Sequence, residues 1–224
     1  MEIPTVKIEL YRSNNKQFAE YLGHLLETIG VAQISGMDDG LVDELYKEAK
    51  KFPRRVGRAK ENSYYQEIFS FTPYSKIWDS IYISPEKRPV NLLRRIKNRF
   101  SQVAEKITDS FDSLYGPVEK PGELLLLRYR KGPQLYPPKK NRKKIMLERH
   151  TDESYFTLAA KASREGLEGY VQERWVPLLP EEGNFLIIPC RSLETVSKGK
   201  VKALEHRIRT PEPESPIRYA LMYY

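Results

Sequence analysis

The sequence predicts an α+β fold that is mainly β, in which a helical region precedes a sandwich of two β-sheets or a double-sheet jelly roll. Two observations predict it. Before residue 117, apolar residues recur at steps of three and four, the period of an amphipathic helix. After Pro117, short runs rich in β-branched and aromatic residues alternate with glycine, proline and charged residues. We therefore expect one folding unit with a helix–strand–helix region and a long support helix over residues 1–116, and the β core over residues 117–224.

The helical region divides into four predicted elements. Residues 16–29 form an amphipathic pattern that stops at Gly30, and residues 31–35 resemble a strand. A second helix is predicted from a cap at Asp38 or Asp39 to about Phe52, before Pro53. The longest helix is predicted over residues 91–114, where the apolar positions fall on one face. These positions are Leu92, Ile96, Phe100, Val103, Ile107, Phe111 and Leu114.

The β core is predicted to hold closely spaced antiparallel strands. The candidate strands are residues 123–130, 145–150, 155–160, 169–172, 175–178, 184–188, 193–197, 202–208 and 217–223. Residues 131–144 contain three prolines and six basic residues and are predicted to form a surface loop.

Composition and charge exclude several classes of protein. No apolar run approaches the roughly 20 residues of a membrane-spanning helix, and the first residues lack a secretory pattern, so a cytoplasmic protein is expected. Cys190 is the only cysteine, which excludes an intrachain disulfide and a cysteine-based zinc site. The net charge of +8 is clustered at residues 50–60, 94–99 and 139–144, which we interpret mainly as solvated surface. Nucleic-acid binding is not expected, because these clusters are not interleaved with aromatic residues.

The histidines carry the chemical signal. The chain has three, and His24 lies among leucines of the first helix, where it needs no role. His150 and Asp152 lie two positions apart at the end of a predicted strand, and such side chains point to the same face. His206 follows in another predicted strand, and two imidazoles with one carboxylate form the triad of non-haem iron(II) oxygenases. For the His150–Asp152 pair alone, a hydrogen-bonded turn is the alternative.

Arg218 adds a second signal. It lies among apolar residues in the terminal strand IRYALMYY, and an arginine there is costly to bury unless it meets an anion. Its guanidinium suits the distal carboxylate of 2-oxoglutarate. The alternative is an arginine on the surface or on an edge strand.

Four segments in order resemble the catalytic core of the isopenicillin N synthase-like 2-oxoglutarate-dependent dioxygenases. They are HTDESYFTLA, LEGYVQERWVPLLPEEGNFLIIP, ETVSKGKVKALEHRIRT and IRYALMYY. The stretch FAEYLGHLLETIGVAQISGMDDGLVDELYKEAKKF also resembles the helix–strand–helix entry region of that family. One departure is clear. The family has Arg-x-Ser in its last strand, whereas this chain has Arg218-Tyr219-Ala220, so a bound carboxylate would lack one hydrogen bond, worth about 1 kcal/mol.

The resemblance implies a double-stranded β-helix, or jelly roll, as the catalytic core. It implies that iron(II) is held by His150, Asp152 and His206, that Arg218 binds the cosubstrate carboxylate, and that Arg128 and Tyr129 contact cosubstrate or substrate. By strand position, four further residues are expected near the iron: Tyr155, Phe156, Thr157 and Tyr219.

The function implied is a dioxygenase that uses iron(II), 2-oxoglutarate and O2 to oxidise, most simply to hydroxylate, an unactivated C–H bond of a small molecule, releasing succinate and CO2. The basic loop at residues 139–144, shortly before His150, favours an acidic substrate. Two alternatives stay open. One is an iron oxidase of the isopenicillin N synthase type that uses no 2-oxoglutarate, and the other is a non-catalytic basic binding protein.

Overall fold

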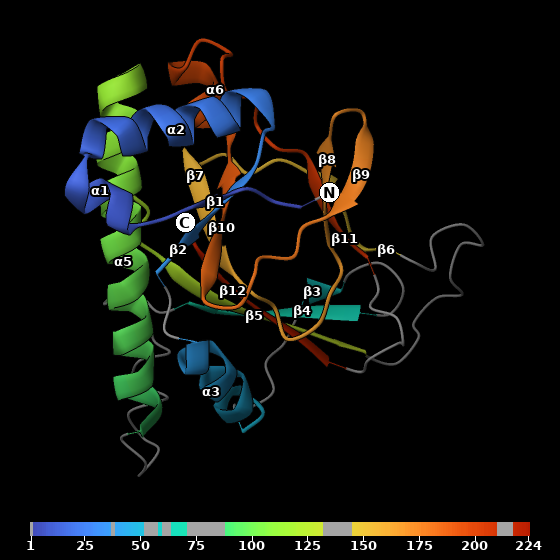
Figure 1. Cartoon of the computed structure of the whole chain (residues 1–224). Coiled ribbons are helices and arrows are strands. Elements are labelled where there is room, and N and C mark those ends of the chain that lie inside the picture. The colour runs from blue at the N-terminus through green and yellow to red at the C-terminus, as the bar shows by residue number, and fades with distance from the viewer. Residues whose placement is uncertain are drawn as a thin grey trace.

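Two facing β-sheets form the centre of the molecule, and helices cover one side of the larger sheet (Figure 1). The computed structural model describes residues 2–36, 39–51, 58–59, 64–70, 88–131, 145–209 and 217–224. The basic loop at residues 139–144 and the basic cluster at residues 52–57 and 60 lie outside them.

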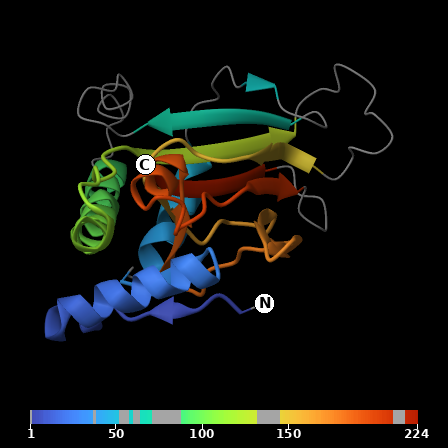
Figure 2. The same ribbon diagram turned by 90° about the horizontal axis from the view of Figure 1, so that it is seen from above.

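From β5 onwards, successive strands alternate between the two sheets, except that β8 and β9 form a hairpin within the smaller sheet. The eight-stranded sheet has the order β1 (Thr5–Val6), β2 (Ala32–Ser35), β10 (Asn184–Pro189), β7 (Phe156–Ala160), β12 (Ile217–Tyr223), β5 (Leu124–Lys131), β4 (Tyr64–Ser70), β3 (Arg58–Ala59). The four-stranded sheet has the order β6 (Ile145–His150), β11 (His206–Arg209), β8 (Leu167–Val171), β9 (Arg174–Pro177). Seen from above, β4, β5 and β12 lie side by side in the larger sheet (Figure 2). This crossing between facing sheets is the predicted double-stranded β-helix.

The helices of the first region pack on the outer side of the larger sheet. They are α1 (Glu9–Ser13), α2 (Asn15–Thr28), α3 (Asp39–Ala49) and the long α5 (Arg88–Tyr115). The Asn14 side chain accepts a hydrogen bond from the Gln17 N–H at 3.0 Å and so caps α2. On α5, the predicted apolar stripe is buried except at the half-buried Leu114, and Ile96, Phe100 and Phe111 are fully shielded from solvent. The predicted amphipathic helices are confirmed.

The alternation of β12 separates two hydrophobic cores. Tyr219, Leu221 and Tyr223 face the helices, whereas Ala220 and Met222 point into the space between the sheets. Successive side chains of a strand point to opposite faces, so one strand contributes to both cores. The second core contains the cavity described below.

Two parts of the sequence prediction need correction. The strand predicted at residues 193–197 is wrong, because Arg191–Val196 forms helix α6. Glu194 accepts hydrogen bonds from the Ala203 N–H and from the Lys202 ammonium, and these contacts beyond the helix stabilise it. The first region also holds more strands than the one predicted, since β1, β3 and β4 lie within it. β1 and β4 form by pairing with segments far along the chain, as β4 does with β5, and β3 pairs with β4. Periodicity within each segment does not reveal these pairings.

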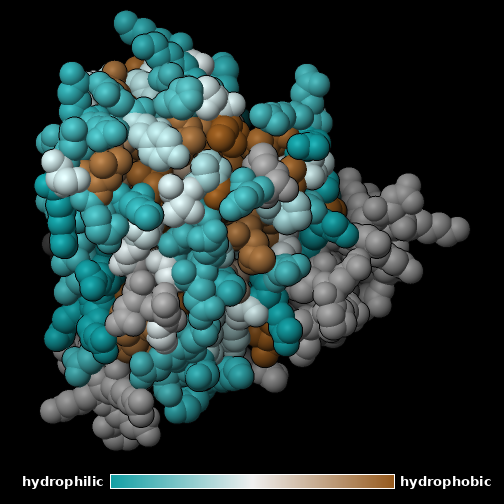
Figure 3. Space-filling view, viewed as in Figure 1, coloured by the Kyte–Doolittle hydropathy of each residue, from teal (hydrophilic) through white to brown (hydrophobic). Residues whose placement is uncertain are grey.

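The helices in the described part of the chain include none long and apolar enough to cross a membrane. The face in Figure 3 is mostly hydrophilic, with separate hydrophobic spots. Large apolar side chains that are exposed within the described ranges are Tyr21, Tyr170, Leu179 and Ile217. The remaining large apolar side chains mostly fill the two cores.

Candidate functional site

Three side chains predicted as metal ligands come together at one end of the smaller sheet. His150 is the last residue of β6, Asp152 follows in the turn to β7, and His206 is the first residue of β11. Antiparallel pairing of β11 with β6 places His206 directly opposite His150. One ligand atom from each of the three residues lies within 4.8 Å of the others. The pairing of β11 with β6 therefore brings His206 next to His150 and Asp152, although they are far apart in the sequence.

The orientation of both imidazoles is set by backbone carbonyls. His150 Nδ1 lies 2.9 Å from the Glu148 carbonyl, and His206 Nδ1 lies 3.0 Å from the Leu204 carbonyl. A carbonyl only accepts, so each Nδ1 must carry the proton. In the neutral imidazole, each Nε2 then holds a free lone pair, and both Nε2 atoms lie 3.9 Å from the same Oδ1 of Asp152.

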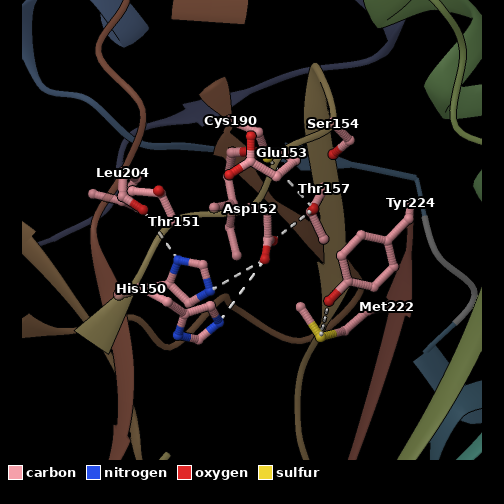
Figure 4. A network of polar contacts seen from close by, with 12 residues as sticks. His150, Thr151, Asp152, Glu153, Ser154, Thr157, Cys190, Leu204, Met222 and Tyr224 are labelled. Carbon is pink, nitrogen blue, oxygen red and sulfur yellow. Dashed lines mark hydrogen bonds and ion pairs between the residues drawn. The ribbon is translucent and has the colours of Figure 1, made fainter. Parts of the chain in front are cut away.

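The carboxylate of Asp152 is held in place from its other oxygen. Thr157, on β7, donates its hydroxyl to Asp152 Oδ2 at 3.0 Å (Figure 4). Because Oδ2 is engaged, Oδ1 is left facing the two imidazoles. Hydrogen bonds of this kind orient metal ligands in known sites.

These contacts leave three electron-pair donors facing one another with no proton between them: the two imidazole Nε2 atoms and Asp152 Oδ1. Burial lowers the pKa of His206, which is 2% exposed, although the charge of Asp152 opposes that shift. The neutral, metal-binding form is favoured accordingly. Three acceptors facing one point repel one another unless a cation lies between them. The set fits a divalent metal, and two imidazoles with one carboxylate suit iron(II).

A cavity of about 470 Å³ between the two sheets extends from the imidazoles to Arg218. Most of its described lining is apolar, including Leu127, Leu186 and Ile208. The inward-facing residues of β12 form one wall: Arg218, Ala220 and Met222, continued by Tyr224 beyond the strand. Ala220, the position where the resembling family has serine, thus presents no hydroxyl to the cavity.

Arg218 is a buried cation without a carboxylate partner among the described residues. It is 2% exposed, and its Nε donates to the carbonyls of Arg164 at 3.1 Å and Glu165 at 3.3 Å. One of its two terminal nitrogens, Nη1, is buried and has no hydrogen-bond partner within the described ranges. Burial lowers the pKa of Arg218, and Tyr129 and Tyr46 oppose that shift. A buried guanidinium with a free donor beside a cavity fits a carboxylate ligand.

The two residues predicted on β5 differ in position. Tyr129 lines the cavity, and its ring centroid lies 5.7 Å from the Arg218 guanidinium carbon. Arg128 points to the opposite face of the sheet, where it donates to the Ala49 carbonyl at 3.4 Å. We therefore assign no cosubstrate contact to Arg128, since neighbouring residues on a strand cannot share one face.

The residues expected near the iron by strand position divide in the same way. Thr157 contacts Asp152, as described above, whereas Phe156 and Tyr219 face the helices. Tyr155 also packs toward the helix-side core. Tyr224 was not singled out by sequence reasoning, yet its side chain lines the cavity and its hydroxyl lies 3.6 Å from Met222 Sδ. Every second residue from Arg218 to Tyr224 faces the cavity, and this alternation could have predicted the position of Tyr224 from the sequence.

Residues 121–224 match the family model of the 2OG-Fe(II) oxygenase superfamily. This part of the chain belongs to that superfamily. The match contains every residue of the triad, the cavity wall on β12 and Tyr129. The triad and the cavity fit the iron(II) and 2-oxoglutarate for which that superfamily is named.

Individual relatives are more distant. The 2-oxoglutarate-dependent dioxygenase AOP2 of Arabidopsis thaliana is 35% identical over 71 residues, which cover 31% of this chain and 16% of that protein. A second Arabidopsis AOP2, named a probable inactive 2-oxoglutarate-dependent dioxygenase, is equally identical over 71 residues and is covered to 18%. Gibberellin 2-beta-dioxygenase 3 of the same plant is 23% identical over 164 residues, 70% of this chain and 45% of that protein. The chain thus spans less than half the length of these relatives.

Solved structures support the same superfamily fold. The dioxygenase for auxin oxidation 1 of Arabidopsis thaliana, solved with 2-oxoglutarate, superposes with a TM-score of 0.72 at 19% identity. The alignment covers 100% of this chain and 92% of that one. The jelly-roll core predicted from the sequence is therefore confirmed.

Proposed function

We propose that this protein is an iron(II)- and 2-oxoglutarate-dependent oxygenase that hydroxylates an unactivated C–H bond of a small molecule, with release of succinate and CO2. The observation that carries the proposal is the convergence of both Nε2 atoms on Asp152 Oδ1 at one end of the cavity, together with Arg218 in the cavity wall, whose Nη1 has no hydrogen-bond partner among the described residues. The membership of residues 121–224 in the superfamily supports it.

In this proposal, His150, Asp152 and His206 hold the iron and Arg218 binds the distal carboxylate of 2-oxoglutarate. Iron with 2-oxoglutarate supplies the activation of dioxygen and the oxidising power. The protein keeps both imidazoles neutral and oriented through the Glu148 and Leu204 carbonyls. Its apolar walls exclude water around the cosubstrate, which strengthens the contact with Arg218.

The substrate class comes from comparison. Solved neighbours include a dioxygenase named for auxin oxidation and a Neurospora crassa protein in complex with 2-oxoglutarate and thymine, and auxin and thymine are both small molecules. We propose a small-molecule substrate here too. The acidic character predicted from the loop at residues 139–144 stays a prediction, as does a cytoplasmic location.

The test is anaerobic addition of iron(II) and 2-oxoglutarate, read as the visible charge-transfer band of the chelate. We expect the wild-type protein to show the band and the Arg218→Ala variant to lose it at the same 2-oxoglutarate concentration, because the charge-assisted contact is gone. Arg218→Lys keeps the charge without the planar fork and should give an intermediate affinity. Iron binding without 2-oxoglutarate should be unchanged in both variants. A wild-type protein that binds iron but shows no band would contradict cosubstrate use.

One alternative has a specific observation in its favour. Ala220 faces the cavity without the serine hydroxyl, which keeps open an iron oxidase in which Arg218 holds a carboxylate of the substrate itself. Succinate formed during turnover separates the two, because only the 2-oxoglutarate-dependent reaction produces it. If the chain were instead a non-catalytic basic binding protein, it would bind nucleic acid with an affinity that falls steeply with salt, and it would bind no iron.

A further inference from the structure

The segment Lys161–Gly166, here called the β7–β8 loop, forms the cavity wall next to Arg218. Four of its residues line the cavity: Ala162, Arg164, Glu165 and Gly166. Two of its backbone carbonyls accept hydrogen bonds from Arg218 Nε at 3.1 and 3.3 Å. The guanidinium is therefore held at Nε by the loop, and this contact sets the direction in which Nη1 points.

The β7–β8 loop is held in turn by β12 and by α3. Ser163 and Tyr219 exchange two hydrogen bonds: the Tyr219 N–H donates to Ser163 Oγ at 2.8 Å, and the Ser163 N–H donates to the Tyr219 carbonyl at 3.0 Å. From α3, the Tyr46 hydroxyl donates to the Lys161 carbonyl at 3.0 Å. The Tyr46 ring stacks on the Tyr219 ring with centroids 5.8 Å apart and planes 20° from parallel.

Tyr46 lies close enough to Arg218 for the charge of the guanidinium to act on the pKa of the Tyr46 hydroxyl. Tyr46 is 5% exposed, and burial raises the pKa of its hydroxyl, while the charge of Arg218 opposes the rise. The hydroxyl stays protonated at neutral pH and acts as a hydrogen-bond donor. A chain of contacts thus runs from Tyr46 through the β7–β8 loop to the buried guanidinium.

We propose that Tyr46 is a positioning residue for the cosubstrate site, which acts through the β7–β8 loop to aim Arg218 at the distal carboxylate of a 2-oxo dicarboxylic acid. This inference rests on the proposed function. Tyr46 lies on α3, outside residues 121–224 that match the superfamily model. The site described by that model is therefore completed by a helix from the first region of the chain.

The physical reason is the geometry of the carboxylate contact. A fork of two N–H donors binds a carboxylate well only within a narrow range of positions. Removing the Tyr46 hydroxyl leaves the partly buried Lys161 carbonyl without this donor, and a shift of the loop moves the guanidinium with it. Small displacements of a binding group weaken the aligned contact out of proportion to their size.

The experiment is a 2-oxoglutarate titration of the anaerobic iron(II) protein, read by the charge-transfer band. Tyr46→Phe keeps the stack on Tyr219 and removes only the hydroxyl. We expect its 2-oxoglutarate Kd to rise about fivefold, the effect of one lost hydrogen bond. Its iron(II) affinity, measured without 2-oxoglutarate, should equal that of the wild type. A purely structural role would lower both affinities or neither.

Tyr115→Phe is the matched control. The Tyr115 hydroxyl also donates one hydrogen bond, to Glu27 Oε1 at 3.0 Å, but Tyr115 does not line the cavity. This variant should keep the wild-type Kd for 2-oxoglutarate. An equal rise in both variants would overturn the assignment of Tyr46.

A double-mutant cycle tests the route through Arg218. In the Arg218→Lys background the guanidinium fork is absent, so adding Tyr46→Phe should change the 2-oxoglutarate Kd by less than about twofold. A full fivefold effect in that background would show that Tyr46 acts by another route and would refute the inference. A wild-type protein without any band refutes the proposed function, and the inference with it. A normal wild-type band with an unaltered Tyr46→Phe titration refutes the inference alone.

Discussion

At the scale of single residues, hydrogen bonds to the other atoms of each ligand side chain define which atoms are available to a metal. Both Nδ1 atoms donate to carbonyls, and Asp152 Oδ2 accepts from Thr157, so only two Nε2 atoms and Oδ1 face the shared point. The lone pairs of these three atoms therefore point toward one shared position. A cation there would satisfy all three, which is why the predicted triad is credible as a ligand set and not only as a sequence pattern.

Thr157 gives a prediction at this scale. Thr157→Val keeps the shape of the side chain but removes the hydrogen bond to Asp152 Oδ2, so the carboxylate loses its fixed orientation. We expect the iron(II) Kd to rise about tenfold, as is usual when the partner of a ligand is removed. Anaerobic equilibrium competition with a coloured iron chelator measures it.

Thr108→Val is the control for that variant. Thr108 is also buried, on α5, and its hydroxyl has no partner within the described ranges. Its removal should leave the iron(II) affinity unchanged. If Thr157→Val also binds iron like the wild type, the carboxylate is positioned by other contacts.

At the scale of elements, the site depends on the register between strands and on one tight turn. His206 faces His150 because β11 and β6 pair at those residues. The tight turn is at Gly166, the last residue of the β7–β8 loop. Gly166 has a φ of +130°, and a Cβ there would lie 2.5 Å from the Arg209 carbonyl oxygen. The Arg209 N–H donates to the Gly166 carbonyl at 2.7 Å, so the turn is tied to β11. The loop that holds Arg218 thus requires glycine at its end.

Gly166→Ala is the prediction at this scale. The added Cβ meets backbone, and its φ is unfavourable for alanine, so we expect the free energy of unfolding to fall by about 1–3 kcal/mol. Urea unfolding followed by circular dichroism measures it. Gly122→Ala is the control, because nothing lies within 4 Å of its added Cβ and its φ is not in the left-handed region. That variant should stay within about 0.5 kcal/mol of the wild type. Equal stability of the two variants would show that the turn relaxes freely.

At the scale of the whole molecule, the first region and the β core share one sheet. Strands β1 to β4 extend the larger sheet on both sides of the strands from residues 117–224. Helix α3 packs near enough to reach the β7–β8 loop. The division of the chain into residues 1–116 and 117–224 stays a prediction. The larger sheet contains strands from both regions.

Metal binding should stabilise this whole unit. The ligands come from the end of β6, the β6–β7 turn and the start of β11, so they converge only in the folded chain. Anaerobic iron(II) at about 100 times its Kd should raise the free energy of unfolding by about 2.7 kcal/mol. Thermal unfolding with and without iron(II) measures the shift in Tm, and a chelator should reverse it.

Two histidine variants make that measurement specific. His150→Ala should abolish the rise, because one ligand is lost from a side chain that is 36% exposed and little needed for packing. His24→Ala, on the exposed side of α2, should keep the full rise. A rise that survives in His150→Ala would place the stabilising iron elsewhere.

The sequence alone determined the amphipathic helices, most strands, the triad and Arg218, because each depends on local periodicity or on residue types that are costly without a role. Periodicity predicted α5 and the alternation of β12, and the scarcity of histidine left few candidates. Periodicity failed at α6, which is stabilised by contacts of Glu194 beyond the helix, and at β1, β3 and β4, which form by pairing with other strands.

Which side chains meet depends on the three-dimensional arrangement of the strands and helices. It turned Arg128 away from the cavity and brought Tyr224 into it. It also linked Tyr46 to Arg218 through carbonyls that no sequence pattern marks. Backbone atoms are chemically alike at every residue, so which of them orient a histidine, an arginine or a loop depends on how the chain folds in space.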